Sequence, residues 1–197
     1  MKVVFLCVLL IILSGFSSKE VEWELKKDKD GIQVYTRKIS DATMRAFRGE
    51  TEVTGSLESI AALFKDVSRY TEWVPGAKLA EVLASSPNSQ IFYLQTDAPW
   101  PVTDRDGVYQ FTFKSSSKSL TILATCLPDY IPIRQDHVRI PKSEGFWEFT
   151  AKENGKIKVV YENHSEPGGS IPGWLANATV VNLPFESLKN LKEMLKY

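Results

Sequence analysis

The sequence has few of the residues that bind metal ions or form disulfide bonds. Its 197 residues include two cysteines and two histidines. Cys7 lies in an apolar run near the start of the chain, so removal of that run would leave Cys126 alone, unable to form an internal disulfide. No Cys-x-x-Cys pair or glycine-rich phosphate loop occurs, and His137 and His164 lack the i, i+4 spacing of a metal-binding helix. The sequence therefore predicts no metal site, no cofactor and a domain stabilised by its hydrophobic core.

The sequence also has no excess of charge of either sign. Lysine and arginine together number 24, and so do aspartate and glutamate. Because a phosphate backbone attracts a basic surface, this balance argues against nucleic acid as a partner. The composition, with 43% hydrophobic and 24% charged residues, is typical of one globular domain with a sizeable core.

The apolar run at the start of the chain is too short to span a bilayer as a helix. Residues 3–13 follow Lys2 and would extend only about 16 Å as a helix, whereas bilayer hydrocarbon is about 30 Å thick. Gly15 and Ser17 then occupy the small-residue positions of a signal-peptide cleavage site. We therefore expect a signal peptide at residues 1–17 and export to the periplasm or the extracellular space. The alternative is an uncleaved N-terminal membrane anchor.

Short apolar and alternating segments predict a sheet of many strands. Asp30-Gly31 marks a turn before the first of them, and polar loops such as "SSPNS" and "SSSKS" separate later ones. Residues 21–25 form a short amphipathic piece that we interpret as a short helix. The expected strands are 32–35, 44–55, 78–83, 91–96, 107–113, 120–127, 145–151 and 157–163.

Two segments change to helical spacing. Apolar residues recur every three or four positions within residues 57–67, and Ser56 is placed to cap the first turn. Residues 172–197 return to this spacing, but Pro184 lies inside them, where a proline removes a backbone hydrogen bond. We therefore expect a kink or break near Leu183. One antiparallel sheet with helices on one side is an α+β fold.

The stretch "DAPWPVTDRDGVY", residues 97–109, joins two of the expected strands. Pro99 and Pro101 cannot donate hydrogen bonds within a sheet, so the preceding strand must end before them. Trp100 is then held on a stiff extended segment, and Arg105 begins the next strand. A structural role, with Trp100 closing the end of the core and Arg105 paired with a carboxylate of a neighbouring element, would explain both residues without a ligand.

Four blocks of sequence point to a known family. They are "YTEWVPGAKLAEVL", "APWPVTDRDGVYQF", "GFWEFTAKENGKIKVVYENHSEPGG" and "IPGWLANATVVNLPFESLKNLKEML". In this order they resemble the START (StAR-related lipid-transfer) domain family, and most of all its small exported bacterial members. The resemblance covers residues 21–197. It implies a helix-grip fold, in which a curved antiparallel sheet wraps around a long C-terminal helix and encloses an apolar cavity.

The resemblance also implies a function without catalysis. The protein would bind, and transfer, a lipid or another hydrophobic small molecule in an internal tunnel, with the C-terminal helix as a lid. It would act as a monomer and make transient contact with a membrane surface. Phe146 and Trp147 are adjacent on a strand, so at most one of them faces the tunnel. The candidate ligand-binding residues are Trp73, Phe92, Trp100, Arg105, Phe111, Trp147, Trp174, Leu175 and Val181.

Two other functions stay open on the sequence. An enzyme, such as a cyclase or a hydrolase, could act on a hydrophobic substrate in the same cavity, and an interaction protein could fill the cavity with its own side chains. The enzyme would need titratable groups that point inward, and nearness in sequence does not establish that. The available groups are His137, His164, Tyr93, Asp97 and Tyr109.

Overall fold

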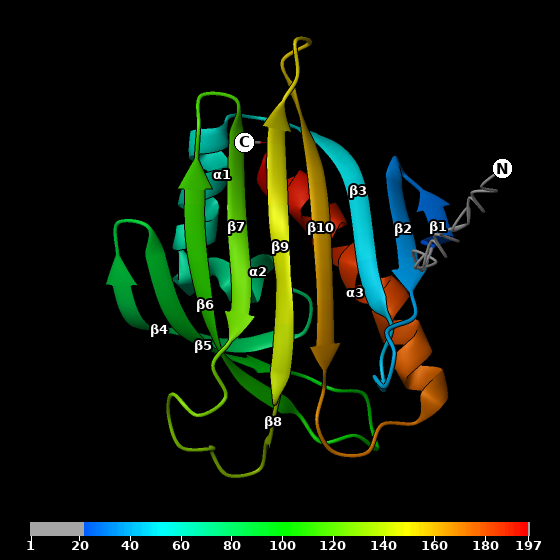
Figure 1. Cartoon of the computed structure of the whole chain (residues 1–197). Helices are drawn as coiled ribbons and strands as arrows, with labels where there is room; N and C mark the ends of the chain where they lie inside the picture. Colours follow the sequence, from blue (N-terminus) through cyan, green and yellow to red (C-terminus); the bar gives the residue numbers. More distant parts are fainter. Residues whose placement is uncertain (1–21, 197) are drawn as a thin grey trace, which may run out of the picture.

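Residues 22–196 are described by a computed structural model of the protein, in which one curved sheet encloses helices on its inner face (Figure 1). The expected signal peptide at residues 1–17 lies outside the described residues. No helix within residues 22–196 is long and apolar enough to cross a membrane.

The sheet has ten strands and is antiparallel except at one short strand. The strands are β1 (Glu24–Lys29), β2 (Ile32–Arg37), β3 (Ala46–Thr54), β4 (Ala77–Ser86), β5 (Ser89–Thr96), β6 (Arg105–Ser115), β7 (Ser119–Cys126), β8 (Val138–Arg139), β9 (Lys142–Ala151) and β10 (Lys156–Glu166). Their order is β1-β2-β3-β10-β9-β7-β6-β5-β4, and β8 pairs in parallel with the start of β6. Every strand expected from the sequence is present, with longer ends in most cases.

The helices all lie on the inner face of the sheet. They are α1 (Leu57–Lys65), the short 3-10 helix η1 (Val67–Arg69), α2 (Tyr70–Trp73) and α3 (Gly173–Met194). Figure 1 shows α3 crossing behind β10 and β3, while α1 and α2 lie behind the other half of the sheet. This arrangement confirms the predicted α+β helix-grip fold.

Local sequence signals fix two of the element boundaries. Asp30 and Gly31 have φ angles of 56° and 70°, the left-handed conformation that a two-residue turn between β1 and β2 requires. Ser56 caps α1, because its hydroxyl accepts a hydrogen bond from the Ser59 N–H and the Ser59 hydroxyl accepts one from the Ser56 N–H. The predicted turn and the predicted cap are both confirmed.

The expected short helix at residues 21–25 is wrong. From Glu24 the chain forms strand β1, which pairs antiparallel with β2. A helix of five residues would be unstable by itself, whereas the tight turn lets β1 pair with β2 along most of its length, with one irregularity between Leu25 and Lys27. Trp23, just before β1, contacts the guanidinium groups of Arg37 and Arg48, which lie 4.6 and 4.7 Å from the centroid of its ring.

The expected kink or break near Leu183 does not interrupt the C-terminal helix. α3 runs from Gly173 to Met194 with Pro184 buried inside it. Gly49 on β3 allows the helix to come close, because a Cβ at that position would lie 2.6 Å from Leu188 Cδ1 and 3.5 Å from Pro184 Cβ. Burial of these side chains against the sheet offsets the hydrogen bond that Pro184 cannot form.

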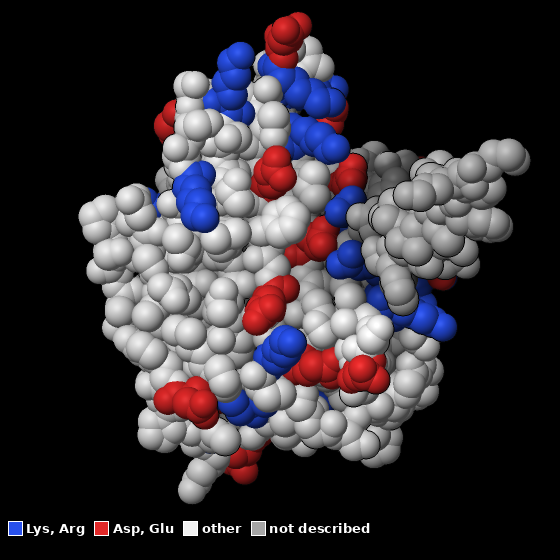
Figure 2. Space-filling view, in the orientation of Figure 1, with Lys and Arg blue, Asp and Glu red and all other residues white. Residues whose placement is uncertain are grey.

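The outer face of the sheet carries charged side chains of both signs. Figure 2 shows lysine and arginine intermixed with aspartate and glutamate, without a large patch of either sign on this face. Arg48 lies 2.8 Å from Glu162, and Lys158 lies 3.3 Å from Glu50. Neighbouring charges of opposite sign on this face therefore pair with one another.

Candidate functional site

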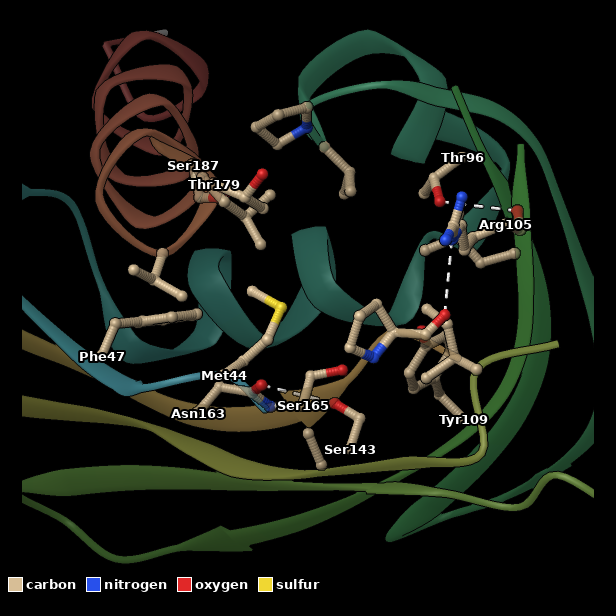
Figure 3. A pocket seen from close by; sticks show the side chains of 18 of the residues that line it. Met44, Phe47, Thr96, Arg105, Tyr109, Ser143, Asn163, Ser165, Thr179 and Ser187 are labelled. Carbon is tan, nitrogen blue, oxygen red and sulfur yellow. Dashed lines mark hydrogen bonds between the residues drawn. The ribbon is translucent and has the colours of Figure 1, made fainter. Parts of the chain in front are cut away.

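A cavity of about 310 Å³ lies between the inner face of the sheet, α2, the β5–β6 loop and α3. Most of the side chains around it are apolar, and Figure 3 shows the polar ones set among them. A cavity lined in this way is typical of a site for a small molecule. The aromatic residues that line it are Phe47, Phe64, Tyr70, Trp73, Phe92, Tyr109, Phe111, Trp147 and Tyr161.

Alternation along the strands places the aromatic rings inward. Phe92 on β5 and Phe111 on β6 meet edge to face, with ring centroids 4.8 Å apart. Trp147 on β9 stacks on Tyr161 of β10, with centroids 3.7 Å apart. Neighbouring strands therefore form an aromatic wall that can bury an apolar ligand.

Two of the aromatic residues that line the cavity, Tyr109 and Tyr161, also carry hydroxyl groups. Gly107 provides the space for the first ring, because a Cβ at Gly107 would lie 2.6 Å from Tyr109 Cε2. Burial raises the pKa of both hydroxyls well above the usual value for tyrosine. Both groups are therefore neutral at pH 7 and can donate hydrogen bonds.

A small polar group faces the cavity from β9 and β10. The Asn163 side-chain amide donates to the Ser143 hydroxyl over 3.1 Å, and Figure 3 shows Ser165 beside this pair. Gly145 permits the close approach of the two strands, because a Cβ there would lie 2.2 Å from the Glu162 carbonyl oxygen. A few such groups within an apolar lining can orient a ligand.

The N-terminal half of α3 forms the opposite side of the cavity. In the other half, Leu188 and Leu191 are fully buried in the core and fix the helix to the sheet. The two halves of α3 therefore have different surroundings. The α3 residues that line the cavity are Leu175, Ala176, Thr179, Val180, Leu183 and Ser187.

The structure brings most, but not all, of the predicted ligand-binding residues to the cavity. Trp100 and Trp174 do not line it, since their side chains are 90% and 66% exposed. Trp100 lies on the loop beyond the end of β5, and Trp174 is on the outer side of the first turn of α3. Val181 packs against the core beside the cavity, and Phe146 lies on the opposite side of β9 from Trp147. Those that line the cavity are Trp73, Phe92, Arg105, Phe111, Trp147 and Leu175.

Arg105 lines the cavity but does not form the expected ion pair with any carboxylate of the described residues. Its guanidinium donates to the backbone carbonyls of Thr103, Pro167 and Gly168, the last two over 3.3 and 3.1 Å. Burial lowers the pKa of Arg105, an effect that the charge of Asp104 opposes, but an arginine stays protonated in a protein. Arg105 therefore connects the β5–β6 loop to the segment before α3 and brings a positive charge to the cavity.

Arg139 is a buried residue that the sequence analysis missed. Its guanidinium donates to both carboxylate oxygens of Asp106, over 2.9 Å each. Burial would by itself raise the pKa of Asp106, but the hydrogen bonds and charge of Arg139 lower it. Alternation indicates only that Asp106, which follows Arg105 on β6, faces the other side of the sheet. It does not identify Arg139 as the partner.

Several cavity residues were also missed by the sequence analysis. Phe47 on β3 and Tyr161 and Asn163 on β10 occupy inward positions, and Met44 precedes β3. The alternation of both strands contained the signal for the first three. For Met44 the sequence offered no such signal, because it lies in an irregular segment.

Two of the five titratable groups considered for an enzyme line the cavity, and the other three do not. Asp97 and Tyr109 line it, whereas His137, His164 and Tyr93 do not. The carboxylate of Asp97 is exposed and lies 2.7 Å from a lysine of β4. Among residues 22–196, no group of three or more histidine, cysteine, aspartate or glutamate side chains is arranged to hold a metal ion.

Comparison with known proteins identifies the family. Residues 4–197 match the family model of the START domain. The crystal structure of a STAR-related lipid transfer protein from Xanthomonas axonopodis is 39% identical, with a TM-score of 0.83 over 89% of this chain and 99% of that chain. An uncharacterized protein of Pseudomonas aeruginosa is 36% identical over 172 residues, 87% of this chain and 85% of that protein. The phosphatidylcholine transfer protein of Bos taurus is 25% identical over 173 residues, 81% of this chain and 78% of that protein. The chain therefore belongs to the START-domain family of lipid-binding and lipid-transfer proteins.

Proposed function

We propose that this protein binds a lipid or another hydrophobic small molecule in the cavity and carries it without changing it chemically. The observation that supports this most strongly is the aromatic-lined space of about 310 Å³ between the sheet and α3. Burial of apolar surface contributes about 25 cal/mol per Å², so about 300 Å² of ligand surface corresponds to roughly 7 kcal/mol before the costs of association. We favour binding over catalysis because neither His137 nor His164 lines this space and the carboxylate of Asp97 is paired with Lys78.

A direct binding experiment tests this proposal. The full chain is titrated with a fluorescent fatty acid, and we expect saturation at one probe per chain and displacement by an unlabelled lipid. Signal that rises without saturation, or that no lipid displaces, would contradict the proposal. Conversion of the probe to a product of different mass would favour an enzyme.

The N-terminal half of α3 is the part of the structure that we propose as the lid. Leu188 and Leu191 anchor the other half to the core. Gly168 and Gly169, before the helix, have φ angles of 66° and 61°, so this segment can adopt conformations that other residues rarely do. Pro184 lies where the two halves meet and cannot donate to the preceding turn. Bending there would open the cavity while the anchored half stays in place.

Two exposed tryptophans support a further proposal, that transfer involves transient contact with a membrane surface. Trp100 follows the cavity-lining Pro99, and Trp174 precedes the cavity-lining Leu175. Tryptophan favours the interface between water and lipid, because its ring is largely apolar and its N–H is polar. Both side chains could therefore contact lipid beside the entrance to the cavity.

Vesicle transfer assays test the membrane contact. Replacing Trp100 and Trp174 together with alanine should slow the transfer of a fluorescent phospholipid between vesicles. Leu25→Ala is the control, because Leu25 is an exposed apolar residue on β1. Equal transfer rates for the double variant and the wild type would contradict the proposed contact.

We propose, on the sequence alone, that the protein acts after export. The grounds are the apolar run at residues 3–13 and the small residues that end at Ser17. The full chain, produced in a Gram-negative host, should appear in the periplasm with the mass of a protein that begins at Ser18. An intact chain in the cytoplasm would contradict export, and an intact chain in the membrane fraction would support the N-terminal anchor.

A further inference from the structure

The charged side chains that line the cavity differ in whether they have a counter-ion. They are Arg45, Asp97 and Arg105. Arg45 lies 3.0 Å from the carboxylate of Glu24, and Asp97 lies 2.7 Å from the ammonium group of Lys78. Arg105, with only 6% of its surface exposed, has no carboxylate within ion-pair distance among the described residues. The cavity therefore carries one positive charge without a counter-ion.

The carboxylates on either side of Arg105 in the sequence have other partners. Asp104 lies 3.0 Å from the Lys78 ammonium group and accepts a backbone hydrogen bond. Asp106 is held by both arms of Arg139. The carbonyls around Arg105 orient its guanidinium through three of five N–H groups but do not neutralise the charge. A buried charge of this kind is costly unless another group provides the opposite charge.

Two other residues of the cavity lining carry hydrogen-bond donors. The hydroxyl of Tyr109 stays protonated, because burial raises its pKa. The indole N–H of Trp73 is buried and has no acceptor among the described residues. Figure 3 shows Arg105 and Tyr109 on the same side of the cavity, across from α3. Because buried donors nearly always have acceptors, this lining fits a ligand that supplies them.

We propose that the cavity selects an acidic amphiphile, whose carboxylate or phosphate head group binds Arg105 and accepts a hydrogen bond from Tyr109. This inference rests on the proposed lipid-binding function and specifies its ligand class. A guanidinium group can donate two parallel hydrogen bonds to the oxygens of a carboxylate or a phosphate. Exclusion of water from the cavity strengthens this pair. The apolar chain of the ligand lies against the aromatic wall, which includes Phe111 and Trp147.

Three ligands with the same apolar chain test the inference. Dodecanoate, dodecyl phosphate and dodecanol compete with a fluorescent probe for the full chain at neutral pH. We expect dodecanoate or dodecyl phosphate to bind at least about tenfold more tightly than dodecanol, because charge-assisted hydrogen bonds are the stronger ones. The tighter of the two acids then distinguishes a fatty acid from a phosphate-bearing lipid. Equal affinity of the acids and dodecanol overturns the inference, whereas failure of all three to bind overturns the proposed function itself.

Variants test which residues cause the preference for acids over dodecanol. Arg105→Gln should abolish the preference for the acids, and Arg105→Lys should keep part of it because the charge remains. Arg69→Gln is the control, because it removes the same charge from an exposed ion pair with Glu72 outside the cavity. A folded Arg105→Gln protein with the full preference overturns the inference. If circular dichroism shows that this variant is unfolded, Tyr109→Phe tests the inference instead. This variant keeps the ring and should lower the preference for the acids several-fold, and an unchanged preference overturns the inference.

Discussion

Replacing Ala124 with phenylalanine should block the cavity. Ala124 lines it from β7, where it pairs with Phe111 of β6 on one side and Gly145 of β9 on the other. An engineered cavity of about 150 Å³ is large enough to bind benzene. A new phenyl ring would therefore occupy about half of the space of about 310 Å³.

The expected effect on binding is large. The phenyl ring would take up the space of about five methylene groups of the ligand, if each needs roughly 30 Å³, the volume of a water molecule in the liquid. At about 0.8 kcal/mol per buried methylene, the ligand would lose about 4 kcal/mol, close to a thousandfold in affinity. The new ring fills existing space, so the cost to stability should not exceed the 1–3 kcal/mol that is typical, as a rough range, of overpacked cores.

Affinity is measured by titration with the fluorescent fatty acid, and stability by urea denaturation. Ala62→Phe is the matched control, since Ala62 is exposed on α1 and the same ring there does not reach the cavity. Wild-type affinity in a folded Ala124→Phe protein would refute the reasoning, because the ligand would then bind elsewhere.

Two further changes test the forces that hold the site in place. Asp106→Asn should destabilise the fold by about 3–5 kcal/mol at neutral pH, measured by urea denaturation, because Arg139 would keep a buried charge without a counter-ion. The folded pKa of Asp106 is lowered from 3.8, so its contribution is present at neutral pH and is lost as the pH falls below 3.8 through the folded value. The wild type should therefore lose stability more steeply than the variant in this acid range, and parallel curves would count against the pair. Gly49→Ala should lower the free energy of unfolding by about 1–3 kcal/mol, because the new methyl group displaces Leu188. Gly173→Ala is the control and should not lower it, because the space around Gly173 is open. Equal stabilities of the two variants would contradict the close approach of α3.

The parts of the fold that sequence analysis predicted have local causes. The turn at Asp30-Gly31 depends on two residues that adopt positive φ, and the start of α1 depends on the Ser56 hydroxyl. Pro184 shows the limit of such rules. Its effect on α3 depends on Gly49, which is distant in sequence and lets the helix pack tightly on β3.

The strand residues of the candidate site were predictable because side-chain direction follows from strand period. Phe92, Phe111 and Trp147 face the cavity because inward and outward positions alternate along their strands. Trp100 and Trp174 lie on a loop and at a helix start, where no period fixes the direction of the side chain. Their aromatic character alone therefore placed them wrongly among the lining residues.

The polar partners were harder to predict than the apolar wall. Arg105 was expected beside a carboxylate, yet its partners are backbone carbonyls that only the folded chain brings to it. Arg139 finds Asp106 across a loop of irregular structure. Such pairs depend on tertiary arrangement, which composition and periodicity do not contain.

Native mass spectrometry of the purified full chain, followed by organic extraction, shows whether the cavity holds a lipid. We expect one chain with a discrete adduct of lipid mass, and an extract that contains an acidic amphiphile. A bare chain whose mass is unchanged after incubation with a mixed lipid extract would contradict the claim that this cavity holds a lipid.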